Sequence, residues 1–272
     1  MIKSYLPDLC NAENTLSNEE RERLVERTLK SAALSGKFPE SIIRDKTFEN
    51  WKQDTEQFSQ IIQEHSALVQ TQENCTVSLS LSAQDLGLAS DFEPAKTENI
   101  NIKLSTQLPI SDNNLVFYRS STPKFKDFIT LYFHQCILDL AKAQQIPEQL
   151  PLDNIHATHG FYFDTKSQKV IQYKYAEITD AKAQLIKFIG YFVKGSQQAV
   201  LVNGELAEKA FNAKVFEQEQ FELFWDDPNA MMSIGNDPYI HYFWPTCPSI
   251  EEVLPELEYL YLDMFNAREQ IK

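Results

Sequence analysis

Residues 155–174, IHATHGFYFDTKSQKVIQYK, predict two strands joined by a polar turn. In the first strand, apolar and aromatic side chains at odd positions alternate with a second set at even positions, and this period of two is typical of a sheet. The turn reads DTKSQ. In the second strand, Val170, Gln172 and Lys174 face the same way, because residues i and i+2 of a strand share a face. We therefore expect Gln172 and Lys174 on one surface of a central hairpin.

This hairpin resembles the core of the PD-(D/E)xK nucleases, in which an Asp on the first strand and an acid-x-Lys on the second converge on a divalent metal. Mg²⁺ prefers carboxylate oxygens, and the lysine assists the attack on the phosphate. The resemblance assigns the lysine to Lys174, the second acid to Gln172 and the first Asp to Phe163 or Tyr162. An amide and an aromatic ring cannot hold Mg²⁺. We therefore expect the fold with a degenerate site, no catalytic residue and no metal; an ordinary core hairpin is the alternative.

Composition places the chain among ordered globular proteins. Its 272 residues are 43% hydrophobic and include 18 Phe, enough for one large core or two small ones. No apolar run reaches the roughly 18 residues of a membrane span, and the first residues lack the apolar segment of a signal peptide. The cysteines are scattered without a CxxC pair, which argues against disulfides and zinc and favours a cytoplasmic location. They are Cys10, Cys75, Cys136 and Cys247.

Charge is distributed unevenly along the chain. The net charge is −14, and residues 215–272 hold 12 acids against only Arg268 and Lys272. Residues 110–176 hold 7 basic and 6 acidic residues, so a polyanion would meet the middle of the chain. If the chain contacts DNA, the candidate cations are Arg119, Lys124, Lys126, Lys166 and Lys169, with Lys174 beside them.

The first half of the chain predicts helices followed by strands. Ser17 and Glu20 form a capping-box pattern that opens a helix, and residues 48–69 carry an apolar seam at helical spacing. Three alternating segments then predict an antiparallel meander. These segments are residues 74–82, 100–108 and 115–118.

The second half predicts helices around the hairpin. Pro123 suits the first position of a long, mostly buried helix, and Thr179 suits the cap of another that Gly195 would close. Ser249 suits the cap of a late helix, which Pro255 would kink or begin. The remaining expectations are an edge strand at 200–202 and helices beyond 203. This order of elements is typical of an α+β domain with a central mixed sheet.

Other motifs add little chemistry. His156 and His159 are three apart, so on a strand they face opposite sides and cannot share a metal. Phosphate-loop, dinucleotide and serine-hydrolase motifs are absent from the sequence. A late aromatic set favours a core or a protein interface over base stacking, because its surroundings are acidic. The set comprises Trp225, Tyr239, Tyr242, Phe243 and Trp244.

Several segments together resemble the C-terminal domain of RecC, the gamma subunit of exodeoxyribonuclease V in the RecBCD helicase–nuclease. Residues 35–40, SGKFPE, are similar to a Gly-x-Leu-Pro-Pro segment between two helices of that family. Residues 115–119, LVFYR, and 124–127, KFKD, resemble its strand leading into a KxKD helix. Residues 235–245, GNDPYIHYFWP, resemble its DPYIR segment near the end. His241 stands where the family tends to have Arg, which removes a candidate DNA contact.

The resemblance spans about residues 17–265 and implies one domain of a longer subunit. It implies a nuclease-like fold without catalytic acids that needs no cofactor. Such a domain would scaffold the alpha and beta subunits and guide DNA during double-strand-break repair by homologous recombination. We expect a helical part at residues 1–72 and a nuclease-like core with a helical end at residues 73–272, together forming one structural domain.

Two alternatives remain open at this point. The first is an active Mg²⁺-dependent nuclease that uses Asp164, Gln172 and Lys174, with Asp127 or Asp139 as a further ligand. The second is a protein-interaction domain that does not contact nucleic acid.

Overall fold

A computed structural model gives the fold of the chain. It describes residues 71–86, 99–119, 121–145, 152–164, 167, 169–227 and 233–271, together with separate positions between 17 and 58. No helix in these ranges is long and apolar enough to cross a membrane.

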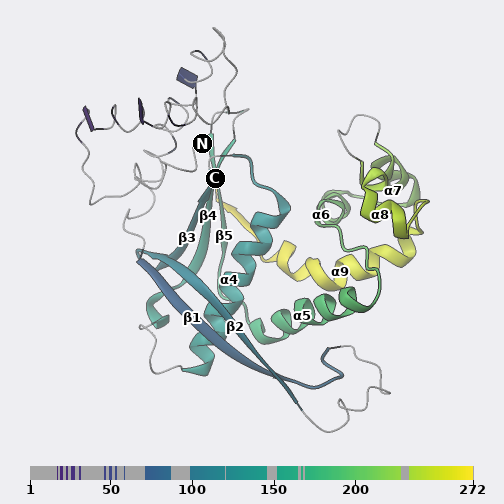
Figure 1. The fold of residues 1–272 in the computed structure, drawn as a ribbon, viewed down its shortest axis with the longest axis horizontal. Helices are drawn as coiled ribbons and strands as arrows, with labels where there is room; N and C mark the ends of the chain where they lie inside the picture. The colour runs from purple at the N-terminus through teal and green to yellow at the C-terminus, as the bar shows by residue number, and fades with distance from the viewer. Residues whose placement is uncertain are drawn as a thin grey trace.

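A mixed sheet of six strands forms the centre of the described fold, with the strands side by side in chain order (Figure 1). Only β3 and β4 are parallel, and the other neighbours are antiparallel. The predicted meander and hairpin are therefore confirmed. The strands are β1 (Thr71–Leu81), β2 (Ile100–Ser111), β3 (Asn114–Arg119), β4 (Ala157–Asp164), β5 (Lys169–Tyr175) and β6 (Glu269–Ile271).

Six α-helices accompany the sheet in the described residues, which confirms the predicted α+β class. The longest, α4 (Phe125–Gln144), connects the parallel strands β3 and β4 and packs on one face of the sheet. The others are α5 (Ala181–Gln197), α6 (Gly204–Asn212), α7 (Gln218–Trp225), α8 (Pro238–Phe243) and α9 (Ile250–Asn266). In Figure 1, α5 and α9 extend away from the sheet, and α6, α7 and α8 lie beyond them as a group.

β4 is buried on both faces, and only His159 and Asp164 in it are partly exposed. Thr158, Gly160 and Tyr162 face α4, whereas Phe161 and Phe163 face a separate small cluster that includes Phe58. Gly160 leaves room for α4, because a Cβ there would lie 2.6 Å from the Leu131 Cδ1 atom and that side chain would have to shift. The absence of a side chain at this position thus favours the close packing of α4 on β4.

A chain of buried polar bonds ties α4 to the sheet and to the segment that enters α5. The Thr158 hydroxyl donates to Gln135 Oε1 at 2.9 Å, and Gln135 Nε2 donates to the Asp139 carboxylate at 3.0 Å. The Ile178 backbone N–H donates to the same carboxylate at 2.8 Å. Because each of these groups would be costly to bury alone, the network specifies one position of α4 over the sheet.

The predicted start of α4 at Pro123 is wrong. Lys124 has extended backbone angles, φ −116° and ψ 160°, so the helix begins at Phe125. The Lys124 N–H donates to the Asp127 carboxylate at 2.7 Å, which satisfies the group that precedes the helix. Pro123 therefore lies before the helix.

Two expectations about α5 are also corrected. Asp180 caps the helix in place of Thr179, because its carboxylate accepts the Ala183 N–H at 3.2 Å. The helix continues through Gly195 and ends at Gln197.

Residues 200–202 form no strand, contrary to the prediction. The Val202 carbonyl accepts a bond from the Tyr261 hydroxyl of α9 at 3.0 Å, and Leu201 is buried in the core, so this segment is held by a helix and not by the sheet.

The end of the chain combines a confirmed cap with a strand that was not predicted. Ser249 caps α9 as expected, and its hydroxyl accepts the Glu251 N–H at 3.2 Å. The helix begins at Ile250, so Pro255 lies inside it. β6 then pairs with β5 at the edge of the sheet.

The N-terminal predictions fall largely outside the described residues. The Ser17–Glu20 capping box is confirmed, because Ser17 N–H donates to Glu20 at 2.8 Å and Glu20 N–H donates to Ser17 Oγ at 3.3 Å. The helix expected at 48–69 is described only at separate positions, and the division at residue 72 stays a prediction.

We predict that Asp139→Ala lowers the free energy of unfolding by about 2–4 kcal/mol, because it leaves the buried Ile178 N–H and the Gln135 amide without an acceptor. Asp139→Asn retains an acceptor and should cost less. Urea denaturation followed by circular dichroism measures both. Equal losses for the two variants would show that the network does not hold the helix.

Burial raises the pKa of Asp139, outweighing its hydrogen bonds with Ile178 and Gln135. A carboxyl with a raised pKa in the folded state stabilises the fold when protonated. Its contribution is lost as pH rises from the ordinary value of 3.8 through the raised one. Asp139→Asn should therefore flatten the dependence of stability on pH over that window.

Candidate functional site

The three positions that the nuclease resemblance singles out share one face of the sheet. The register pairs His159 with Lys174, Phe161 with Gln172, and Phe163 with Val170. Residues that pair across strands lie on the same face, so this face, opposite α4, carries the aromatic, the amide and the lysine together. Their common placement follows from the hairpin.

The first of these positions lies in a hydrophobic cluster. The Phe163 side chain is 1% exposed, and its ring centroid lies 5.9 Å from that of Phe58. Val116 and Phe161 complete the cluster. Tyr162, the other candidate for the first acid, points to the opposite face and packs against Phe128 of α4, with ring centroids 6.5 Å apart. Neither aromatic offers an oxygen to a metal on the Gln172 face.

Gln172 is engaged by a neighbouring histidine. Its Nε2 atom lies 2.9 Å from His159 Nδ1, and because an amide nitrogen donates, Nδ1 is the acceptor and the ring proton is on Nε2. Burial lowers the pKa of His159, and the positive charge of Lys174 lowers it further. His159 is therefore neutral at neutral pH, and the Gln172 amide is occupied by its hydrogen bond to the His159 ring.

The acids proposed for an active nuclease are not collected on this face. Asp164 is one residue beyond Phe163 and therefore faces the other way; its carboxylate accepts from Ser167 Oγ at 2.7 Å and from Thr122 Oγ1 at 3.5 Å. Asp127 forms an ion pair with Arg119 at 2.6 Å. Asp139 belongs to the buried network of α4. The described residues contain no group of three or more His, Cys, Asp or Glu side chains placed to hold a metal.

The basic candidates gather at one end of the sheet. Because β3 and β4 are parallel, their carboxyl ends meet near the first turn of α4. Lys124 and Lys126 are exposed there, and Lys169 is exposed at the start of β5, opposite Asp164 in the register. Lys166 lies outside the described residues.

Arg119 differs from these lysines because it is already occupied. Its side chain is 14% exposed, forms the ion pair with Asp127 and donates to the Thr122 carbonyl at 2.6 Å. Arg119 therefore fixes the turn between β3 and α4, a role that its sequence position did not indicate.

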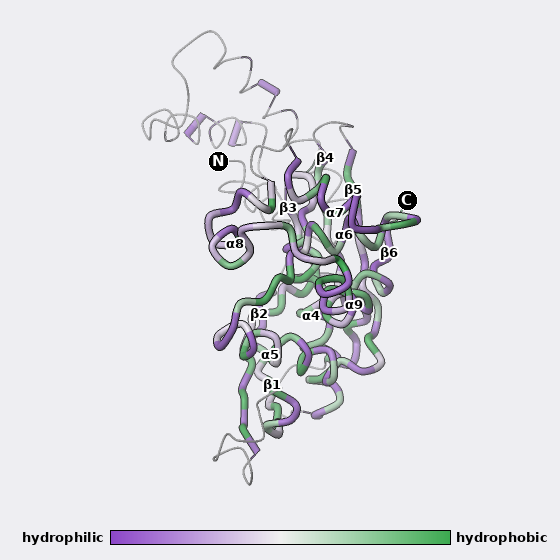
Figure 2. The backbone as a smooth tube through the Cα atoms, turned by 90° about the vertical axis from the view of Figure 1, so that its right-hand side faces the viewer, coloured by the Kyte–Doolittle hydropathy of each residue, from purple (hydrophilic) through white to green (hydrophobic). Residues whose placement is uncertain are grey.

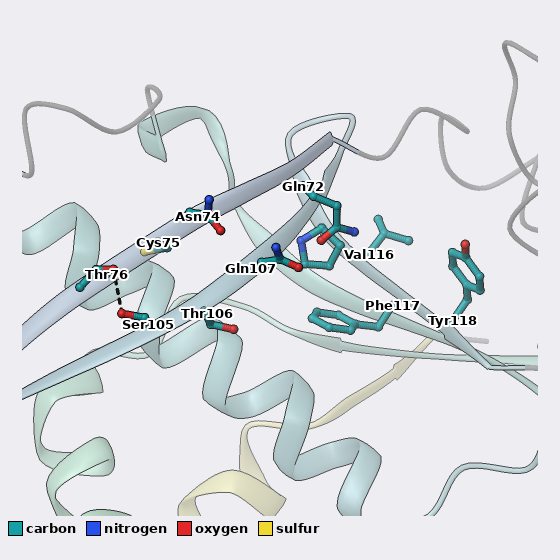
Figure 3. A pocket seen from close by; sticks show the side chains of 11 residues that line it. Gln72, Asn74, Cys75, Thr76, Ser105, Thr106, Gln107, Val116, Phe117 and Tyr118 are labelled. Atoms are coloured by element: carbon teal, nitrogen blue, oxygen red, sulfur yellow. Dashed lines mark hydrogen bonds between the residues drawn. The ribbon is translucent and has the colours of Figure 1, made fainter.

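Sequence reasoning missed an open cavity of about 770 Å³ between the β1–β2 ribbon and β3 (Figure 3). It forms because β2 pairs with β3 over only two residue pairs and then diverges from it. Amide and hydroxyl side chains line one wall, among them Gln72 and Gln107, and Phe117 and Tyr118 line the other. The lining contains no charged side chain. The alternation of polar residues along both ribbon strands is the signal that would have indicated it.

A comparison with protein families identifies the chain. A model of the RecC C-terminal domain matches residues 9–214. The chain belongs to the RecC C-terminal domain family. Membership implies that the chain is part of a subunit of the RecBCD complex. In that complex the subunit acts together with other subunits and with DNA. The match stops before the DPYI segment, so the resemblance seen at 235–245 lies beyond it. Neither the curated proteins nor the solved structures gave a significant match.

We predict that Gln172→Glu raises the pKa of His159, because a carboxylate beside Nδ1 favours the charged ring and offsets Lys174. Titration of the His159 ring signals by NMR measures this shift. Lys174→Met, which removes the neighbouring positive charge, should move the pKa in the same direction. A His159 pKa that stays fixed in both variants would show that these side chains do not meet in solution.

Proposed function

We propose that this chain is a non-catalytic, nuclease-like module of the RecBCD complex, as part of the gamma chain of exodeoxyribonuclease V. It holds the alpha and beta subunits and guides DNA during repair of double-strand breaks by homologous recombination in the cytoplasm. The observation that carries the proposal is the sheet face where Phe163, Gln172 and Lys174 lie together. On this face a PD-(D/E)xK nuclease would need two carboxylates.

The chemistry of this face supports the absence of catalysis. A hydrolytic Mg²⁺ site needs oxygen ligands and access for water. Phe163 instead contributes to a dry cluster under Phe58, and Gln172 holds the neutral ring of His159. Lys174 remains beside them without acids to complete a site. The PD-(D/E)xK assignment rests on this pattern of positions.

The proposal treats residues 1–72 and 73–272 as two parts of one structural domain. Phe58 belongs to the first part, yet it is fully buried against Phe161 and Phe163 of the second. A shared apolar cluster of this kind favours parts that fold together.

The exposed lysines at the carboxyl ends of β3 and β4 support a role in guiding DNA. Lys124, Lys126 and Lys169 are exposed, and none of them forms an ion pair with another of the described residues. Lysines so placed attract phosphates without reading sequence, which suits a guide that must accept any duplex.

We predict that the purified chain neither binds Mg²⁺ or Mn²⁺ tightly nor cleaves linear duplex DNA. Isothermal titration and a gel assay on a labelled duplex measure the two properties. Lys174→Ala is the control, since any cleavage that survives it comes from a contaminant. Metal-dependent cleavage that disappears with Lys174→Ala would establish an active nuclease and refute the proposal.

We predict that the double variant Lys124→Ala/Lys126→Ala weakens duplex binding and reduces the slope of log K against log salt by about two, because each lysine that neutralises a phosphate adds about one unit. Fluorescence anisotropy at several salt concentrations measures the slope. Lys182→Ala, an exposed lysine on α5, is the matched control and should leave it unchanged. An unchanged slope in the double variant would exclude this end of the sheet as the contact.

A further inference from the structure

α8 exposes three aromatic rings to solvent. The exposed fractions are 82% for Tyr239, 79% for Tyr242 and 56% for Phe243, and we call these three residues the aromatic patch. The rings of Tyr242 and Phe243 meet edge to face, with centroids 4.9 Å apart. Figures 1 and 2 both place α8 at the outside of the described fold. Exposed apolar groups gathered in this way mark an interaction site more often than scattered ones do.

The helix that carries the patch is attached to the fold at its start and through one side chain. Asp237 caps α8 by accepting the N–H groups of Tyr239 at 2.9 Å and Ile240 at 3.2 Å. Ile240 is partly buried and packs against the hydrophobic core. Just before α8, Gly235 lies so close to Trp225 that a Cβ would be 2.3 Å from the indole nitrogen. The rings are therefore presented by a fixed helix, and an interface that uses them loses little conformational entropy on binding.

The segment of sequence that contains the patch is acidic. Residues 215–267 contain 11 Asp and Glu residues and no Lys or Arg. Two of these acids lie near Cys247, just after α8: burial raises the pKa of this thiol to about 11, with Glu222 and Asp226 as further causes. Phosphates are repelled by such a surface, whereas basic side chains are attracted to it.

We infer that the aromatic patch docks a protein subunit of the RecBCD complex, one that presents an apolar contact ringed by basic side chains. The inference rests on the proposed scaffolding function and names the surface that performs it. Exposed Tyr and Phe rings match the composition of protein interfaces, and the acidic character of this part of the chain favours a basic partner.

The test uses the complete chain and the other subunits of its complex, produced together and immobilised for biolayer interferometry. Tyr242→Ser/Phe243→Ser should weaken binding at least about tenfold, as expected when hot-spot rings are removed. Phe192→Ser is the matched control, because this ring on α5 is 81% exposed and lies outside the patch; it should leave binding unchanged. Binding of the unaltered chain should weaken as the NaCl concentration is raised from about 50 to about 300 mM, because salt screens the attraction between opposite charges.

The outcomes separate the inference from the proposed function. If the patch variant binds the subunits as the unaltered chain does, the inference fails, but the proposed scaffolding function is unaffected. If the unaltered chain binds no subunit, both fail. Anisotropy with an oligo-dT strand and sedimentation of the isolated chain complete the test. If the patch variant loses only DNA binding, the patch binds nucleic acid and the inference is overturned. If it loses only a dimer, the patch binds a second copy of the chain and the inference is likewise overturned.

Discussion

The buried bonds of Gln135 and Asp139 position α4, and the rest of the described fold is arranged around that helix. The Gln135 amide joins α4 to β4 through Thr158, and Asp139 joins it to the segment before α5 through the Ile178 N–H. An apolar helix face could slide over a sheet with little change in contact area. A network in which each buried polar group needs a particular partner allows one register only. The crossover through α4 makes β3 and β4 parallel, so their carboxyl ends lie at the same end of the sheet.

Once α4 covers one face of β4, the other face determines what the domain can do. A catalytic Mg²⁺ site and a dry aromatic cluster make opposite demands on a surface, because one needs hydrated carboxylates and the other excludes water. Here Phe58 closes the cluster over Phe161 and Phe163. This face therefore contributes apolar packing at a position that the nuclease resemblance would assign to a metal ligand.

Periodicity was sufficient for the parts of the fold whose pattern is local. The alternation in β1, in β2 and in the β4–β5 hairpin reflects one buried surface in each case, as does the wide apolar stripe of α4. These strands and this helix could therefore be predicted. The same alternation predicted that Gln172 and Lys174 share a face. β6 could not, because its place depends on Arg268, whose guanidinium lies 4.1 Å from the Phe128 ring and 2.9 Å from Glu208. The pairing of Arg119 with Asp127 and the cover of Phe163 by Phe58 are likewise contacts between distant segments, which a pattern along the chain does not contain.

The net charge of −14 is compatible with a role in guiding DNA because charge acts locally in salt. At physiological ionic strength the screening length is about 8 Å, so a phosphate near Lys124 responds mainly to the groups around the first turn of α4. In that turn Asp127 is already neutralised by Arg119, and Asp164 is hydrogen-bonded by Ser167 and Thr122. The lysines there set the local potential. Residues 215–267, which include α7 and α9, contain no lysine or arginine, so this part of the chain supplies no cation of its own to a phosphate.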